Sequence, residues 1–218
     1  MSSKPNLQPP TDAVGARERL LDAATALFAA HGYEATSVRQ IIEQAGTNLG
    51  GVNYYFGGKR GLYLAVMARE GERARAFTTG LPRAAATDPP GRRLESVVLR
   101  LLTFFVASHS RLPRLAALEI VNPSPDFDPE ELSVHDAERD ELRAIVADVL
   151  GRGHGEEALD QAVRAVLSQC VYFMFMEPAL RRAGAAVVTD AAAVRALAAQ
   201  IATFSLGGLR ALAAARSS

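Results

Sequence analysis

Six polar side chains between residues 39 and 59 could hydrogen-bond to phosphates and to base edges. They are Arg39, Thr47, Asn53, Tyr54, Tyr55 and Lys59. The apolar residues of the same stretch fall at other positions, so no hydrophobic face needs these six. Cations, hydroxyls and an amide are the groups that bind the phosphate oxygens and base edges of DNA. The stretch therefore predicts a contact with nucleic acid.

Two short helices would position these side chains, and the first has clear start and stop signals. Ser37 followed by Gln40 is typical of a capping box, and Gly46 is typical of a left-handed helix end. Four apolar residues lie at helical spacing between these signals and predict one buried face. They are Val38, Ile41, Ile42 and Ala45.

The second helix follows after a tight turn. Asn48 can cap it, Leu49 and Val52 are expected to point inward, and Phe56 closes it before Gly57. Two short helices joined in this way are the helix-turn-helix pattern, whose second helix enters the major groove of DNA.

Gly50 and Gly51 lie inside this second helix and leave two interpretations open. Each costs about 1 kcal/mol of helix stability relative to alanine, which fits a loosely specified first turn. Alternatively, they let the backbone approach DNA closely. Tyr54 and Tyr55 are also ambiguous, because a tyrosine can pack its ring on the core while exposing its hydroxyl.

Helices on both sides must supply the core that two short helices lack. We expect one over Ala16–Ala30, ended by His31 and Gly32, and another from about Lys59 to Arg75. Their apolar stripes are Leu20, Ala24, Leu27 and Phe28 in the first, and Leu62, Leu64, Val66 and Met67 in the other.

Residues 16–75 resemble the DNA-binding domain of the TetR family of bacterial one-component regulators. Gly46, Gly50, Phe56 and Lys59 match the family string, and the form from Asn48 to Lys59 is similar to the CecR-like branch. Asn53 replaces the usual tyrosine, Tyr55 replaces the usual histidine, and glycines 50 and 51 replace small alanines.

The resemblance implies roles for the residues of this segment. Asn48 stands at the family's helix cap. The side chains expected to touch phosphates are Ser37, Thr47, Tyr54, Tyr55 and Lys59. The residues expected nearest the bases are Arg39, Gly50, Gly51 and Asn53.

The composition of the 218 residues favours an all-α protein. Ala and Leu are abundant, β-branched runs are rare, and the formal net charge is zero. Residues 1–75 hold nine Lys/Arg and seven Asp/Glu, a net charge of +2, which balances −2 in the rest. This bias is mild, so DNA binding would need a local patch and two copies of the domain. No uninterrupted apolar run has the ~18–20 residues of a membrane helix.

Three segments are predicted: a disordered tail over 1–13, a DNA-binding domain over 14–75, and an effector-binding and dimerisation domain over 76–218. Prolines and glycines between Gly80 and Gly91 predict a break between helices. The helices expected after it are Leu94–Ser108, Leu112–Val121, Pro129–Leu150, Glu156–Ala183 and Val188–Ala214.

A second resemblance lies in the later segment. The run from Glu119 to Pro125 is similar to the Glu-x-x-Asn-Pro-Ser/Thr-Pro element of CecR-type C-terminal domains. The family implies a small-molecule effector and a homodimer through the last two helices. Candidate ligand-binding residues are Phe104, Phe105, His109, Glu119, Gln169, Tyr172, Phe173 and Met176. Any of the apolar ones can be plain core. A buried Glu119 needs a partner, and we favour Arg114 or Arg181 over a cationic ligand.

An enzyme is the main alternative class. Cys170 lies in an apolar run where cysteine behaves as a small hydrophobe. His135 and Asp136 could ligate a metal with Glu131 or Glu138, although a solvated face explains them better. We therefore expect no catalytic residues, no metal and no cofactor.

The sequence predicts a cytoplasmic, homodimeric repressor that a small molecule releases from a palindromic operator. The alternative is a helical small-molecule-binding or adaptor protein without specific DNA binding, which leaves Lys59 and the tyrosine pair without a role.

Overall fold

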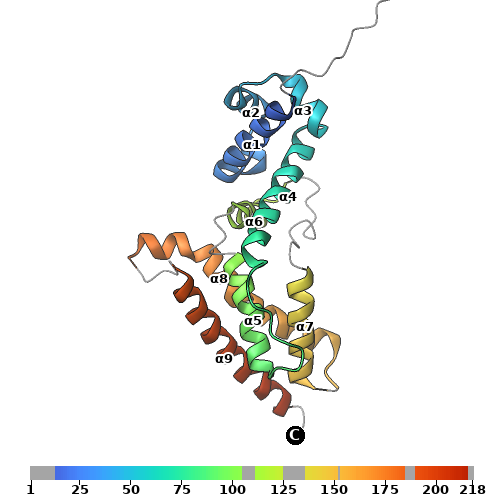
Figure 1. The fold of residues 1–218 in the computed structure, drawn as a ribbon, viewed down its shortest axis with the longest axis vertical. Helices are drawn as coiled ribbons and strands as arrows, with labels where there is room; N and C mark the ends of the chain where they lie inside the picture. Colours follow the sequence, from blue (N-terminus) through green and yellow to red (C-terminus); the bar gives the residue numbers. More distant parts are fainter. Residues whose placement is uncertain (1–12, 105–110, 125–135, 152, 185–189, 216–218) are drawn as a thin grey trace, which may run out of the picture. The chain divides into compact units, whose positions relative to one another are not determined.

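Helices make up the regular structure of the chain, as predicted (Figure 1). The computed structural model describes residues 13–104, 111–124, 136–151, 153–184 and 190–215. Within these ranges the helices are α1 (Ala13–Ala35), α2 (Val38–Ala45), α3 (Leu49–Phe56), α4 (Lys59–Thr78), α5 (Pro90–Leu102), α6 (Leu112–Val121), α7 (Asp136–Leu150), α8 (Glu156–Arg182) and α9 (Ala191–Ala215).

These bounds agree closely with the predicted helices. The predicted break between Gly80 and Gly91 lies between α4 and α5, and α6 has the bounds expected for it. The predicted helix from Pro129 is described only from Asp136, because its first residues lie outside the described ranges. The expected extension of α5 beyond residue 104 lies outside them too.

The chain forms two compact units. The first comprises Met1–Arg69 and Leu115–Phe127, and the second comprises Glu70–Arg114 and Asp128–Ser218. The division therefore falls inside α4 and again inside α6. The predicted domain boundary at residues 75 and 76 did not include this return of 115–127 to the first unit.

The first unit packs α1, α2, α3 and the start of α4 around a small core. Leu20, Phe28, Ile41, Val52 and Leu62 are all at most 1% exposed. The core side chains come from four different helices, so removing any one helix would expose the others.

Gly32 changes the direction of the chain within α1. Its φ of 82° and ψ of 176° are not helical, so the helix proper ends there and only a short turn continues to Ala35. The predicted stop at His31 and Gly32 coincides with this kink. Beyond it, Tyr33 packs edge-on against Tyr63, with ring centroids 5.1 Å apart.

Arg69 joins α4 to α1 at the edge of this unit. Its Nη2 donates to the Leu21 carbonyl at 3.1 Å and to Thr25 Oγ1 at 2.6 Å. Its Nη1 forms an ion pair with Asp22 at 2.7 Å. The Arg69 side chain is 15% exposed, so these bonds are partly shielded from water and hold the two helices in register.

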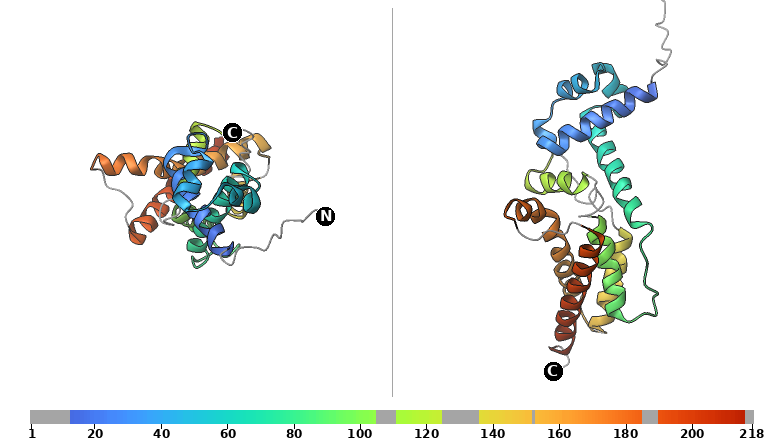
Figure 2. Two further views of the ribbon diagram at one scale, coloured as in Figure 1. Left: turned by 90° about the horizontal axis from the view of Figure 1, so that it is seen from above. Right: turned by 60° about the vertical axis from the view of Figure 1, so that its left-hand side comes forward.

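The second unit has its own core, built by α5, α7, α8 and α9. The helices α5 and α9 run side by side in both sets of views (Figures 1 and 2). The core residues of α5 include Leu94, Val97, Val98, Leu101 and Leu102. The breadth of this apolar surface agrees with the prediction that the helix would be central.

A buried arginine links α5 to α7 within this unit. Arg100 is fully buried, forms an ion pair with Glu141 and donates to Ser96 Oγ at 2.9 Å. Glu138 and Glu141 also pair with Arg83, both at 2.9 Å. A buried cation needs such partners, and here they tie the segment before α5 to α7.

The helix α9 is long and apolar enough to cross a membrane by length and composition alone. Core helices of soluble proteins meet the same two criteria, and 33% of its most apolar window is buried inside the chain. Val194, Ala198, Ile201, Ala202 and Leu209 contribute to the core of the second unit. This packing accounts for part of its apolar surface, whereas Phe204 and Leu212 are exposed.

Gly61 is required where α4 meets the end of α3. A Cβ atom built at Gly61 would lie 1.7 Å from the carbonyl oxygen of Phe56. We predict that Gly61→Ala lowers the free energy of unfolding by at least about 2 kcal/mol, because backbone must move to accept the methyl group. Urea unfolding measures this loss. Gly80→Ala is the control, since nothing lies within 4 Å of a Cβ there, and equal stability of the two variants would contradict the prediction.

Candidate nucleic-acid interface

The ends of α2 have the local structure that the sequence predicts. Ser37 Oγ accepts a hydrogen bond from the Gln40 backbone N–H at 3.2 Å, and the Ser37 N–H donates to Gln40 Oε1 at 2.8 Å. Gly46 ends the helix in the left-handed conformation, with φ 61° and ψ 40°. The capping box and the glycine stop are therefore both confirmed.

The start and end of α3 are equally well defined. Asn48 Oδ1 accepts from the Gly51 N–H at 3.2 Å. Gly57 ends the helix with φ 70°, and its N–H donates to the carbonyls of Val52 and Asn53. The helix therefore has a cap at each end, as expected.

Leu49 does not point inward, and that prediction is wrong. Val52 is 1% exposed, whereas the Leu49 side chain is 57% exposed. The reason is that α1 approaches α3 further along the helix. A Cβ atom on Gly51 would lie 3.3 Å from Leu20 Cδ1 of α1, and Leu49 lies before this contact.

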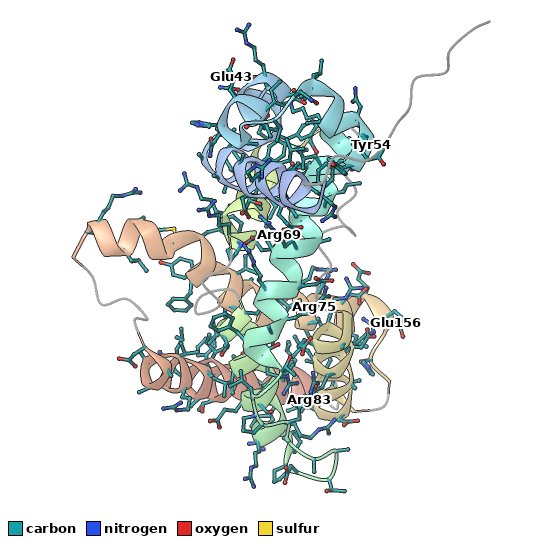
Figure 3. The ribbon with its side chains drawn as sticks, turned by 45° about the horizontal axis from the view of Figure 1, so that its top comes forward. Glu43, Tyr54, Arg69, Arg75, Arg83 and Glu156 are labelled. Carbon is teal, nitrogen blue, oxygen red and sulfur yellow. The ribbon has the colours of Figure 1, made fainter. Side chains whose placement is uncertain are left out.

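The exposed face of α3 consists of Leu49, Gly50, Asn53 and Tyr54. Their spacing places them along one side of a helix. Tyr54 is 69% exposed and is labelled in Figure 3. Within the described residues, the Asn53 side chain has no hydrogen-bond partner. This face therefore presents an amide, a hydroxyl, a bare backbone and an aliphatic group to solvent.

The two tyrosines divide the roles that the sequence left open. Tyr55 is half-buried, and its ring would be 3.8 Å from a Cβ atom on Gly51. Tyr54 packs edge-on against Tyr55, with ring centroids 4.9 Å apart, and remains exposed. Tyr55 therefore covers the core and supports Tyr54.

The two glycines also differ. At Gly51 a side chain would press on Leu20, so this glycine allows α1 and α3 to pack closely. At Gly50 a Cβ atom would meet only the Asn48 side chain, at 3.3 Å. Among the described residues, its chain neighbours aside, no other side chain and no other helix lies within 4 Å of that Cβ atom, so the position leaves room for close approach by a ligand.

The two candidate cations belong to the helices on either side of α3 in the chain, Arg39 to α2 and Lys59 to α4. Lys59 Nζ lies 4.2 Å from the centre of the Tyr33 ring, a cation–π contact. Arg39 is 85% exposed and pairs with Glu43 at 2.9 Å. An exposed pair of this kind is weak, so a phosphate can compete for the Arg39 guanidinium.

Of the two candidate hydroxyls near the turn, one is hydrogen-bonded in the helix cap and the other is buried. Ser37 Oγ serves the capping box. Thr47 Oγ1 is buried and has no hydrogen-bond partner among the described residues. A phosphate contact by Thr47 therefore needs a rotation of its side chain.

The candidate ligand residues do not form one cluster. Phe104 is buried in the second unit, whereas Glu119 belongs to the first. Phe105 and His109 lie outside the described residues, and Met176 is half-buried. The set therefore cannot be described as a single cavity.

Glu119 is buried, as expected, but its described partner is not an arginine. Its Oε2 accepts a hydrogen bond from the Ser124 backbone N–H at 2.9 Å. Ser124 Oγ in turn accepts from Arg60 at 3.5 Å. Glu119 therefore closes the chain after α6 rather than pairing with Arg114, which is exposed. Of Arg181, the other predicted partner, the side chain is not described.

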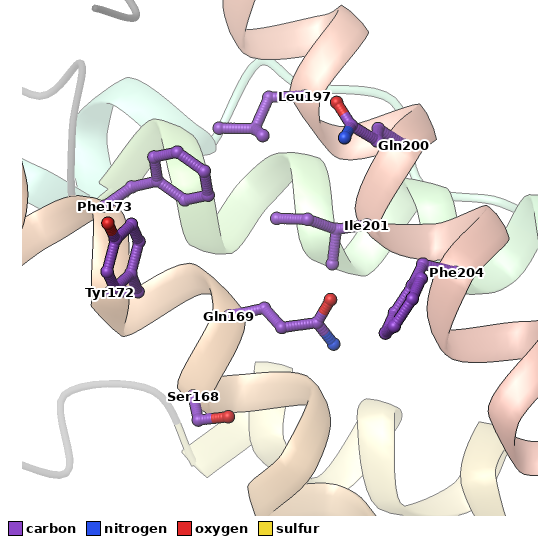
Figure 4. A pocket seen from close by; sticks show the side chains of 8 residues that line it. All are labelled: Ser168, Gln169, Tyr172, Phe173, Leu197, Gln200, Ile201 and Phe204. Carbon is purple, nitrogen blue, oxygen red and sulfur yellow. The ribbon is translucent and has the colours of Figure 1, made fainter.

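Three of the remaining candidates line an open pocket of about 460 Å³ between α8 and α9 (Figure 4). They are Gln169, Tyr172 and Phe173. The sequence analysis missed the other lining residues, which are Ser168, Leu197, Gln200, Ile201 and Phe204. Tyr172 is 49% exposed and Phe204 76%, so the pocket is a groove with aromatic edges. Gln200 and Phe204 lie four residues apart on α9, and this spacing could have predicted that they share one face of the helix.

Two of the groups suggested for enzyme chemistry, Cys170 and Glu138, are buried or paired. Burial raises the pKa of the Cys170 thiol to about 12. Glu138 pairs with Arg83, and His135 and Glu131 lie outside the described residues. Among the residues that the structure describes, no three His, Cys, Asp or Glu side chains gather as metal ligands.

Two family models match the chain. Residues 20–66 match bacterial regulatory proteins of the tetR family. Residues 90–209 match the C-terminal domain of the HTH-type transcriptional dual regulator CecR. The first match covers α2 and α3 and the second covers most of the second unit.

Curated relatives match over part of their length. The HTH-type transcriptional dual regulator CecR of Shigella flexneri is 33% identical over 123 residues, which are 54% of this chain and 52% of that protein. The HTH-type transcriptional repressor KstR of Mycolicibacterium smegmatis is 36% identical over 85 residues, 39% of this chain and 41% of its own. The chain thus spans about half the length, or less, of these relatives.

Solved structures share the fold. A bacterial regulatory protein of the tetR family from Rhodococcus RHA1 has a TM-score of 0.63 at 21% identity, over 88% of this chain and 95% of its own. A tetR-family transcriptional regulator from Streptomyces coelicolor has a TM-score of 0.57 at 23% identity, over 93% and 83%. At such identities the likeness supports the fold alone.

Cys170 provides a test of the second unit's packing. We predict that a thiol reagent at pH 8 leaves Cys170 unmodified in the native protein and modifies it in urea. The reason is that the buried thiol, with a pKa of about 12, stays protonated and covered. Mass spectrometry after a timed exposure measures the modified fraction. Rapid modification without denaturant would show that the apolar run around Cys170 is open.

Proposed function

The chain belongs to the TetR family of bacterial regulators, in the branch with the CecR-type C-terminal domain, and from this premise we propose that it is a DNA-binding transcriptional repressor. The observation that carries the proposal is the exposed face of α3. Its amide, hydroxyl and bare backbone are held outward while Val52 anchors the opposite side. A short helix presented in this way suits the major groove.

The proposed contacts follow from the exposure of each group. Asn53 and Arg39 lie toward the bases, together with the backbone at Gly50. Tyr54 and Lys59 bind phosphates. The other expected phosphate contacts are Ser37, Thr47 and Tyr55, and Asn48 is the helix cap. These four residues also stabilise the local fold, so their substitution would affect folding as well as binding. Gly51 supports packing rather than base contact.

We propose a homodimer formed by the last two helices. Support comes from the α8–α9 groove, whose edge residues Tyr172 and Phe204 are exposed although large and aromatic. Leu212 of α9 is exposed as well, at 51%. Apolar surface of this kind favours a protein partner. A second subunit also doubles the number of phosphate contacts, because each subunit brings one DNA-binding domain, and the net charge of that domain is small.

The two DNA-binding domains of such a dimer would read a palindromic operator. In a two-fold dimer the half-sites lie about 34 Å apart, one turn of the duplex, or a multiple of it. A small-molecule effector that binds better to dimers with a different distance between the two DNA-binding domains would shift the population toward those dimers. The operator would then be released. The effector would bind among the helices of the second unit. Such a regulator works in the cytoplasm, and its function requires no catalytic activity.

Selection from a pool of random duplexes tests the proposal. Purified protein is incubated with the pool at about 150 mM salt, and bound DNA is recovered and sequenced through several rounds. We expect a palindromic sequence to be enriched. The absence of any enriched sequence would contradict the proposal and favour a helical ligand-binding or adaptor protein instead.

The salt dependence of binding tests the role of Lys59. We predict that Lys59→Ala weakens binding to all sequences and lowers the slope of log Kd against log salt by about one per subunit, because one phosphate contact is lost. Fluorescence anisotropy with the selected duplex between 50 and 200 mM salt measures both effects.

Two controls separate this contact from folding. Lys59→Arg should keep the slope, since it keeps the charge. Arg92→Ala removes an exposed cation of α5, in the second unit, and should leave the slope unchanged. A Lys59→Ala protein with normal helicity and an unaltered slope would rule out the phosphate contact.

A further inference from the structure

We propose that Leu49 reads the C5-methyl group of a thymine in the major groove, an inference that rests on the proposed function. It assigns to this side chain a specificity for thymine that its helix position alone would not reveal. The operator half-site would then contain a thymine whose methyl group, not only its hydrogen-bonding edge, contributes to recognition.

The first support is the position of the side chain. Leu49 is the first residue of α3 and is 57% exposed, whereas Val52, three residues later, is buried. A single exposed leucine is ordinary on a protein surface, so exposure alone would not suffice. The identity of its neighbours adds the necessary information.

Those neighbours are the groups that read DNA. Asn53 lies one helical turn after Leu49 on the same side, with an amide that has no partner among the described residues. Gly50 has no side chain, and a Cβ atom there would have only the Asn48 side chain within 4 Å. Leu49 therefore projects beside a bare stretch of backbone, where its methyl groups meet no side chain from the next residue.

The chemistry of the major groove supplies the matching ligand. The thymine C5-methyl is the apolar group that a base pair presents there, and apolar side chains recognise it by contact. An amide such as that of Asn53 pairs with N6 and N7 of adenine. The two positions are about 6 Å apart along the helix axis, so the thymine should lie within about two base pairs of the adenine.

Replacement of thymine by uracil tests this inference directly, because it removes the methyl group and keeps the base pairing. Each thymine of the selected duplex is replaced in turn, in one half-site and then in both. We expect one position per half-site at which wild-type affinity falls about fourfold, and about fifteenfold when both half-sites are changed, since one methyl group is no longer buried.

Variants of the protein complete the test. Leu49→Ala should bind the thymine and uracil duplexes equally, because the apolar partner is gone. Leu49→Met should retain the preference, since its side chain still reaches the methyl group. Val121→Ala is the matched control, as Val121 is 81% exposed and lies on α6, outside α3.

The outcomes separate this inference from the proposed function. One outcome is that a palindrome is enriched and wild-type protein binds every uracil-substituted duplex as tightly as the thymine duplex. This result would overturn the role of Leu49 and leave the proposed repressor function intact. A thymine preference that persists in Leu49→Ala would overturn it too. Failure to enrich any sequence would overturn both.

Discussion

The recognition helix α3 depends on its surroundings to exist at all. It has eight residues, and two of them are glycines, so as an isolated segment it would be unfolded. Asn48 and Gly57 satisfy its ends, Val52 anchors its buried side, and Gly61 lets α4 begin against the Phe56 carbonyl. With so few residues used for packing, most of the remaining surface of α3 is free to contact DNA.

The chain passes three times between the unit that holds α3 and the second unit. The unit of α3 also contains residues 115–127, so the boundaries follow Arg69 in α4, Arg114 in α6 and residue 127. In the first unit, Glu119 and Arg60 both bond to Ser124, which ties the end of α6 to the start of α4. The proposed effector control requires a change in the second unit to affect α3, and these covalent connections join the two units directly.

Local signals in the sequence predicted the helix ends, because a cap is decided by residues three or four apart. Ser37, Gly46, Asn48 and Gly57 are confirmed for this reason. The roles of Leu49 and Gly51 were not fixed by local signals, because they depend on where Leu20 of α1 meets α3. The partner of Glu119 was missed since it is a backbone N–H, which no side-chain pattern reveals. The DNA and ligand contacts themselves remain predictions.

The central claim is that α3 enters the major groove twice on each operator. Protection of the selected duplex from methylation by dimethyl sulfate tests this claim. Dimethyl sulfate modifies guanine N7 in the major groove and adenine N3 in the minor groove. The account predicts two patches of protected guanine N7, related by two-fold symmetry and about one duplex turn, or a multiple of it, apart. Protection of adenine N3 alone, or of a single patch at saturating protein, would contradict it.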